Sequence, residues 1–207
     1  MVRRHWRYYE RACVDKTIGI SRVDTVCWFP DGIEQFPIGK DEYVNGDNLC
    51  RRLIATYEKM IGFDGFNKFV IIEPDTIFFR PLDFSEGIAA YRAGYRQPGF
   101  KAGTYWHNPW CADRYMAKLI VSTGYNLIRD NEIERGFPDQ FFGRIIETIG
   151  CECQPIPGYS KNTIENEKEA ADAANACLKG GAFIHGVKRK ETLDFIESVW
   201  AKHSEND

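Results

Sequence analysis

The most constraining feature of this chain is an apolar strand-like segment that ends on two acidic residues. Residues 69–72 read Phe-Val-Ile-Ile and run into Glu73-Pro74-Asp75, after which residues 76–79 read Thr-Ile-Phe-Phe. A continuous apolar run of this length is typical of a strand that is covered on both faces, as in parallel sheets. Pro74 lacks a backbone N–H and suits the point where ladder pairing stops. The pattern predicts two carboxylates at the carboxyl end of a central strand.

That position favours a metal site. In open α/β sheets, ligands bind beyond the carboxyl ends of the strands. Carboxylate oxygens on a short turn are what Mg²⁺ or Mn²⁺ requires when the ion also carries substrate phosphates. An isolated acid-x-acid triplet is common and would only solvate a strand end, but here an apolar segment lies on each side of it. We therefore expect Glu73 and Asp75 to bind a divalent ion.

Composition narrows the class of protein. With 207 residues, of which 43% are hydrophobic, the chain is long enough for one substantial core, so we expect a single domain over residues 1–207. The net charge is −3 and there is no basic tail, which argues against a nucleic-acid partner. No run approaches the roughly 20 apolar residues of a membrane span, and the N-terminus lacks an apolar signal core, so a cytoplasmic location is expected. Seven cysteines, an odd number, fit reduced core thiols.

Periodicity predicts alternating helices and strands, and hence an α/β/α sandwich with a mostly parallel central sheet. Residues 104–110, rich in aromatics with polar tips, are expected to form a loop that suits a sugar ring or a small hydrophobic cluster. Helices are expected over residues 3–17, from a cap at Asp47 or Asn48 to Gly62, and over 110–128, 138–149, 164–178 and 189–202; strands are expected over 22–28, 68–73, 77–80, 88–91, 102–106, 152–156 and 182–184.

A second candidate ligand lies near the C-terminus. His185 follows the short apolar strand predicted over residues 182–184, and Gly186 and the basic cluster 188–190 come next. A neutral imidazole can complete a Mn²⁺ site beside carboxylates, and Lys188 can neutralise a diphosphate. The alternative is a histidine that ends a strand, followed by a solvated basic first turn of a helix. If the two strand ends converge, His185 joins the acidic pair.

The helix predicted from Pro138 begins with Asp139 and Gln140. A carboxylate in the first turn is stabilised in its charged form by the helix dipole. This placement improves the helix start in any protein, and it also provides a rigid, ionised group that can hold a substrate hydroxyl. We expect Asp139 and Gln140 to take part in catalysis.

Together, three motifs resemble the GT-A superfamily of nucleotide-sugar glycosyltransferases, in particular small members related to glycogenin and to bacterial or viral galactosyl- and glucosyltransferases. Residues 70–82 are similar to that family's strand, D-x-D motif and following strand with an Arg-Pro-Leu ending, although Glu73 replaces the first aspartate. Residues 137–142 are similar to its Asp-Gln helix start. Residues 183–188 resemble a shortened form of its late His-x-x-Gly-x-x-Lys segment.

The resemblance implies a role for each matching residue. Asp75 would bind Mn²⁺ or Mg²⁺, and Glu73 would reach the metal or the ribose of the donor. His185 would be the third metal ligand, and Lys188 would bind the diphosphate. Asp139, with the glutamine after it, would lie near the donor sugar and the acceptor.

The implied function is a metal-dependent hexosyltransferase that uses a nucleoside-diphosphate sugar, by expectation a UDP-sugar, and a glycan or other hydroxyl acceptor. Family domains open on a strand, whereas this chain opens on a predicted helix, so a first strand is expected to be missing. That departure leaves open a catalytically degenerate domain that binds nucleotide sugars or glycans. A sugar nucleotidyltransferase is less favoured, because no Gly-rich phosphate loop occurs near the start.

Overall fold

The structure is a computed structural model. It describes residues 18–22, 34–38, 49–73, 75–82, 84, 86–92, 105–130, 138–161 and 163–204. The helix expected over 3–17, the strand expected over 22–28 apart from Arg22, and Pro74 lie outside these residues. The elements are β1 (Ile18–Arg22), β2 (Glu34–Ile38), α2 (Leu49–Ile61), β3 (Lys68–Ile71), β4 (Thr76–Phe78), β5 (Ile88–Arg92), β6 (Tyr105–Asp113), α3 (Arg114–Arg129), α4 (Pro138–Ile149), β7 (Gln154–Pro155), β8 (Gly158–Ser160), α5 (Glu167–Leu178), β9 (Phe183–His185) and α6 (Lys190–Ser204).

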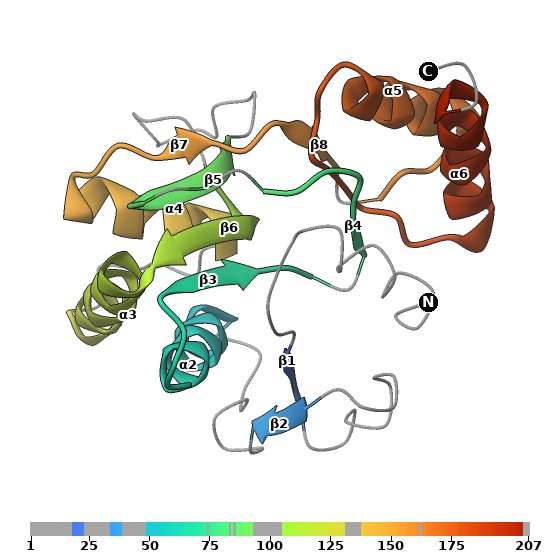
Figure 1. Cartoon of the computed structure of the whole chain (residues 1–207). Helices are drawn as coiled ribbons and strands as arrows, with labels where there is room; N and C mark the ends of the chain where they lie inside the picture. The colour runs from blue at the N-terminus through green and yellow to red at the C-terminus, as the bar shows by residue number, and fades with distance from the viewer. Residues whose placement is uncertain are drawn as a thin grey trace.

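The fold is mixed α/β, as expected, but its strands are not mostly parallel. A four-stranded sheet has the order β3-β6-β5-β7, and a three-stranded sheet has the order β4-β9-β8 (Figure 1). In each sheet antiparallel pairs occur beside one parallel pair, β5 with β7 and β9 with β8. β1 and β2 form a separate parallel pair. The prediction of a mostly parallel central sheet was therefore wrong.

The direction of the strands follows from their connections. A parallel pair of consecutive strands needs a crossover of a dozen or more residues, usually a helix. Among the described residues, β3, β4, β5 and β6 follow one another without a helix between them. β6 consequently inserts antiparallel between β3 and β5, with Val70 opposite Cys111 on one side and Ala89 opposite the same cysteine on the other.

Most of the expected elements agree with the structure to within a few residues, and several regions differ. β1 ends at Arg22, where the expected strand over 22–28 begins, and β2 was not among the expected strands. β6 runs from Tyr105 to Asp113, so the strand expected over 102–106 continues through residues 107–109, which we expected to be a loop, and α3 begins at Arg114 rather than at residue 110. The Asp113 side chain accepts a hydrogen bond from the Met116 N–H and caps α3 there. β8 lies between the strand expected over 152–156 and the helix expected over 164–178, where no further strand was expected.

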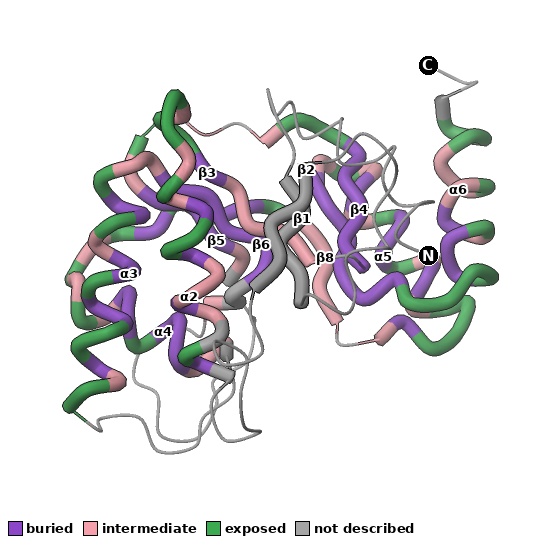
Figure 2. The backbone as a smooth tube through the Cα atoms, turned by 90° about the horizontal axis from the view of Figure 1, so that it is seen from below, coloured by how far each residue is buried: buried purple, intermediate pink, exposed green. Residues whose placement is uncertain are grey.

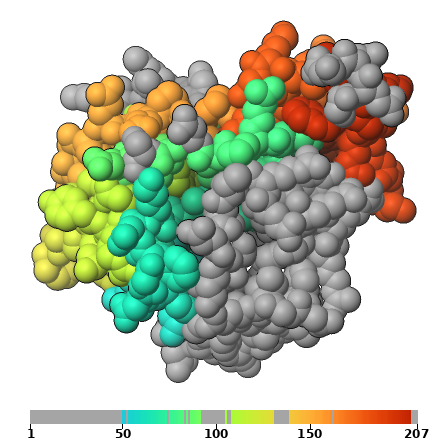
Figure 3. Space-filling view, in the orientation of Figure 1, coloured from blue at the N-terminus to red at the C-terminus, as the bar shows by residue number. Residues whose placement is uncertain are grey.

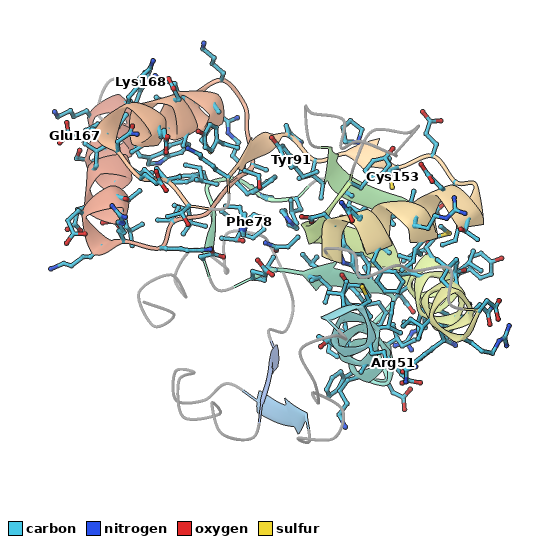
Figure 4. All side chains as sticks on the ribbon, turned by 180° about the vertical axis from the view of Figure 1, so that it is seen from behind. Arg51, Phe78, Tyr91, Cys153, Glu167 and Lys168 are labelled. Carbon is cyan, nitrogen blue, oxygen red and sulfur yellow. The ribbon has the colours of Figure 1, made fainter. Side chains whose placement is uncertain are left out.

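Apolar packing divides the described residues into two ends joined by a middle cluster. Helices α2, α3 and α4 pack with the four-stranded sheet, whereas α5 and α6 pack beside the three-stranded sheet (Figures 1 and 2). The middle cluster includes Phe78, Cys111 and Phe183, with Tyr91 packed against it. Phe78 and Tyr91 lie between the two sets of helices in Figure 4, and the two ends are also apart in the space-filling view of Figure 3. The two sheets are therefore linked through buried aromatic side chains.

We expect Arg114 to stabilise the C-terminal end of α2 and the turn that follows it. Its guanidinium donates to the backbone oxygens of Ile61 and Phe66, at 2.9 and 2.7 Å, and also to Phe63. Arg114→Ala would leave these carbonyls without a charged donor, so the free energy of unfolding should fall by about 2–4 kcal/mol in urea denaturation. The control Arg129→Ala, whose side chain is 71% exposed, should change it by less than about 0.5 kcal/mol. Equal effects would contradict the anchoring role.

Candidate metal centre

Pairing between β4 and β9 brings the predicted ligands together. The two strands are antiparallel, and Thr76 lies directly opposite His185. Asp75 immediately precedes β4, and its backbone oxygen accepts a hydrogen bond of 3.1 Å from the Val187 N–H. The two segments are thus joined by main-chain bonds at the point where the acidic turn meets the end of β9.

Glu73, Asp75 and His185 present ligand atoms that all lie within 4.8 Å of one another. Nδ1 of His185 is 3.4 Å from Oδ1 of Asp75, and Nε2 of the same ring is 3.8 Å from Oε2 of Glu73. The His185 side chain is only 5% exposed, and that of Asp75 only 12%. The expectation that the two strand ends converge is confirmed.

Lys188 lies at the edge of this cluster. Its Nζ is 3.6 Å from Oδ2 of Asp75, and its side chain is 48% exposed. The ammonium group therefore balances part of the acidic charge and remains accessible to a ligand from solvent. Among these four side chains, with a neutral imidazole, the two carboxylates outnumber the single ammonium, which favours a bound cation.

A fourth strand contributes a buried amide to the same place. Asn108 of β6 is 0% exposed, and its Oδ1 accepts a hydrogen bond of 2.7 Å from the Glu73 N–H. Its Nδ2 lies 3.0 Å from Nδ1 of His185, 3.1 Å from Oγ1 of Thr76 and 3.5 Å from Oε2 of Glu73. Asn108 thereby connects the acidic turn, β4 and β9 through one side chain.

The turn after His185 depends on a glycine. Gly186 has a φ of +93°, a conformation that L side chains rarely adopt. A Cβ atom at this position would lie 2.0 Å from the backbone oxygen of Lys161. The Gly186 oxygen also accepts a hydrogen bond of 3.0 Å from the Ile164 N–H, so a main-chain bond joins this turn to the segment that follows β8.

Asp139 and Gln140 lie in the first turn of α4, and each is partly buried. Phe142 of the same helix stacks on Trp110, with ring centroids 5.6 Å apart. Burial raises the pKa of the Tyr57 phenol well above its usual value; the neighbouring indole N–H of Trp110 opposes this rise, and the charges of Glu73 and Asp139 add to it. Both carboxylates therefore lie within electrostatic reach of the Tyr57 phenol.

The donor set of the cluster fits a divalent ion. Mn²⁺ and Mg²⁺ take carboxylate oxygens, and Mn²⁺ also accepts an imidazole nitrogen. Ligands about 2.1 Å from an ion lie about 3 Å apart when adjacent and about 4.2 Å apart when opposite. The separation of 3.8 Å between Nε2 of His185 and Oε2 of Glu73 lies within this range, and one ligand atom from each of the three residues lies within 4.8 Å of the others. A small inward movement of the side chains would complete such a site.

The thiols of the described residues do not suggest a catalytic role. Cys50, Cys111, Cys151, Cys153 and Cys177 are free. Burial raises the pKa of Cys111, Cys153 and Cys177 to about 12, so these thiols stay protonated at neutral pH. All five are free thiols, and the expectation that they lie in the core holds for four of them, since Cys151 is partly exposed.

Sequence reasoning missed two residues of the cluster, Thr76 and Asn108. Thr76 follows Asp75 directly, and its hydroxyl lies 3.2 Å from Nδ1 of His185. Asn108 belonged to a segment that we assigned to a loop. Their roles depend on which strands pair, and that information is not visible in either local sequence.

Comparisons with known proteins found solved structures of similar fold. No protein-family model and no curated protein matches the chain. A solved structure described as a glycosyltransferase involved in the glycosylation of the major capsid of PBCV-1 is similar over 97% of this chain and 92% of its own, with 11% identity and a TM-score of 0.49. A similarity of this size does not assign an activity to this chain.

No helix in the described ranges is both long and apolar enough to cross a membrane.

Proposed function

We propose that this protein is a metal-dependent glycosyltransferase that transfers a hexose from a nucleoside-diphosphate sugar to a hydroxyl acceptor. The observation that carries the proposal is the gathering of Glu73, Asp75 and His185 within ligand distance of one another, with the ammonium of Lys188 beside them. Two carboxylates, an imidazole and an accessible cation form a suitable site for a divalent ion and a diphosphate.

Each residue has a proposed role that follows from its place. Glu73, Asp75 and His185 would hold Mn²⁺ or Mg²⁺, which supplies positive charge to the diphosphate as it leaves. Lys188 is half exposed and would contact the same phosphates, because Asp75, the acid beside it, would then face the ion. Asp139 and Gln140 would hold the sugar or the acceptor hydroxyl by hydrogen bonds.

Thermal unfolding in the presence of ligands tests this proposal. The purified protein would be heated with a panel of nucleoside-diphosphate sugars, each with and without Mn²⁺. At a donor concentration of 100 Kd, binding should stabilise the fold by about 2.7 kcal/mol and raise the midpoint by roughly 5–10 °C, only when donor and metal are both present. No shift with any pair would contradict the proposal.

A second assay separates an enzyme from a binding domain. Glu73 replaces the aspartate of the similar motif, and a degenerate domain could retain donor binding without turnover. Release of the nucleoside diphosphate would be measured with the donor chosen by the thermal panel, with and without a set of glycan acceptors. A shift without release in any mixture would favour the binding domain.

A further inference from the structure

The orientation of the buried Asn108 amide is set by a backbone donor. The N–H of Glu73 can only donate, and it lies 2.7 Å from Oδ1 of Asn108. The NH₂ group must therefore point the other way, toward Nδ1 of His185 at 3.0 Å and Oγ1 of Thr76 at 3.1 Å. Since an NH₂ group is only a donor, it constrains where the imidazole proton can lie.

Two hydrogen-bond arrangements satisfy this geometry. In the first, the Asn108 amide donates to Nδ1, so the neutral His185 ring carries its proton on Nε2. In the second, Nδ1 carries the proton and donates it to Oγ1 of Thr76, 3.2 Å away. The amide then donates to the same hydroxyl oxygen and to Oε2 of Glu73, at 3.5 Å. The threonine oxygen has two lone pairs and can accept both bonds.

Only the second arrangement frees Nε2 for a metal ion. A metal binds the unprotonated ring nitrogen, and a histidine ligand almost always donates its other N–H to an acceptor. Nε2 is the nitrogen on the side of Glu73, at 3.8 Å from its carboxylate. Two oxygens lie near Nδ1, Oγ1 of Thr76 at 3.2 Å and Oδ1 of Asp75 at 3.4 Å. The Asp75 oxygen is itself a candidate metal ligand. Of these two oxygens, the Thr76 hydroxyl is the nearer and the one that is not a candidate metal ligand.

We infer that Thr76 is a positioning residue that acts through His185: its hydroxyl accepts the Nδ1 proton and so lets Nε2 bind the divalent ion. The inference rests on the metal site of the proposed function. Thr76 is 0% exposed and lies directly opposite His185 in the ladder, which fixes the distance between the two side chains. Asn108 stabilises the opposite arrangement, in which the ring carries its proton on Nε2.

Two substitutions at Thr76 test the inference by calorimetric titration of Mn²⁺ in the absence of a donor. Thr76→Val keeps the shape and removes only the hydroxyl, so Mn²⁺ affinity should fall by roughly 10–100-fold. Thr76→Ser restores the hydroxyl and should bind Mn²⁺ within about threefold of the original protein. Thr76→Val should still fold, because the Asn108 amide keeps Nδ1 of His185 and Oε2 of Glu73 as acceptors.

A spectroscopic measurement needs no variant. ¹⁵N NMR of the imidazole nitrogens reports which one carries the proton, and the chain contains only four histidines. For His185, the proton should lie on Nε2 in the metal-free protein and on Nδ1 after addition of Zn²⁺, a diamagnetic ion that imidazole binds well. An Nδ1 that stays unprotonated in the metal-loaded protein would overturn the inference.

The outcomes separate this inference from the proposal on which it rests. If the original protein binds Mn²⁺ and Thr76→Val binds it equally well, the positioning role is wrong and the metal site stands. If the original protein binds no Mn²⁺, both are wrong. Weaker binding by Thr76→Val with recovery in Thr76→Ser supports the role, since a loss of packing alone would not be reversed by the smaller serine.

Discussion

Replacement of Asp75 by asparagine is expected to lower the affinity for Mn²⁺ by at least about 100-fold and to abolish metal-dependent sugar transfer. Both oxygens of this carboxylate face other members of the cluster, Oδ1 toward His185 at 3.4 Å and Oδ2 toward Lys188 at 3.6 Å. Asparagine has the same shape but no charge. With Lys188 still present, the remaining carboxylate of Glu73 would be balanced, so the site would lose its net attraction for a cation.

The fold should survive this change. Asp75 is joined to β9 through its backbone oxygen, which accepts from the Val187 N–H at 3.1 Å, and a side-chain substitution leaves that bond in place. Lys188 is half exposed and can be hydrated when it loses its partner. Mn²⁺ titration and thermal unfolding would be compared with Asp64→Asn, a change at an exposed aspartate in the turn after α2. Unchanged Mn²⁺ binding by Asp75→Asn would exclude Asp75 as a ligand.

Local patterns were sufficient to predict the elements that carry the acidic turn and the late histidine. The apolar stripe of α2 ends at Gly62 as expected, and α4 begins at Pro138. His185 is the last residue of β9, after a short apolar run. Each of these features depends on residues within a few positions of one another, where periodicity and helix signals are most informative.

The error at β6 has an identifiable cause. Residues 104–110 were assigned to a loop because of their aromatic side chains with polar tips, whereas Pro109, which lacks an N–H, lies inside the observed strand. In the structure, β3 pairs with β6 only as far as Trp110, and the pairing with β5 is irregular between Ala90 and Arg92, which lie opposite Trp110 and Tyr105. Pro109 therefore lies where the ladder is interrupted on both sides. The interruption depends on two partner strands, and the sequence around Pro109 does not encode their register.

The same limit applies to the hydrogen-bond network of the site. Thr76 and His185 are 109 residues apart and meet only because β4 and β9 pair in one register. A shift by one residue would turn Thr76 to the other face of the sheet and remove the contact. Sequence motifs indicated the charged ligands, whereas the neutral groups that orient them became visible only from the strand pairing.

Gly186→Ala is expected to be the most destabilising single substitution at the site. Alanine at a φ of +93° would cost about 1–2 kcal/mol in backbone strain. Its Cβ would also lie 2.0 Å from the Lys161 backbone oxygen. Because this oxygen belongs to the main chain, it cannot move aside as the end of a flexible side chain could. We therefore expect the free energy of unfolding in urea to fall by about 3–5 kcal/mol. Mn²⁺ affinity should fall as well, because Gly186 follows the ligand His185 directly.

Gly65→Ala is a matched control for the backbone term. Gly65 has a φ of +84°, close to that of Gly186, but an added Cβ there would meet no atom within 4 Å. The free energy of unfolding of Gly65→Ala should fall only by the roughly 1–2 kcal/mol of backbone strain, and its Mn²⁺ affinity should not change. The difference between the two variants then measures the contact with Lys161. An equal loss in both would mean that the segment after β8 moves away without cost, and that it does not hold the turn that places His185.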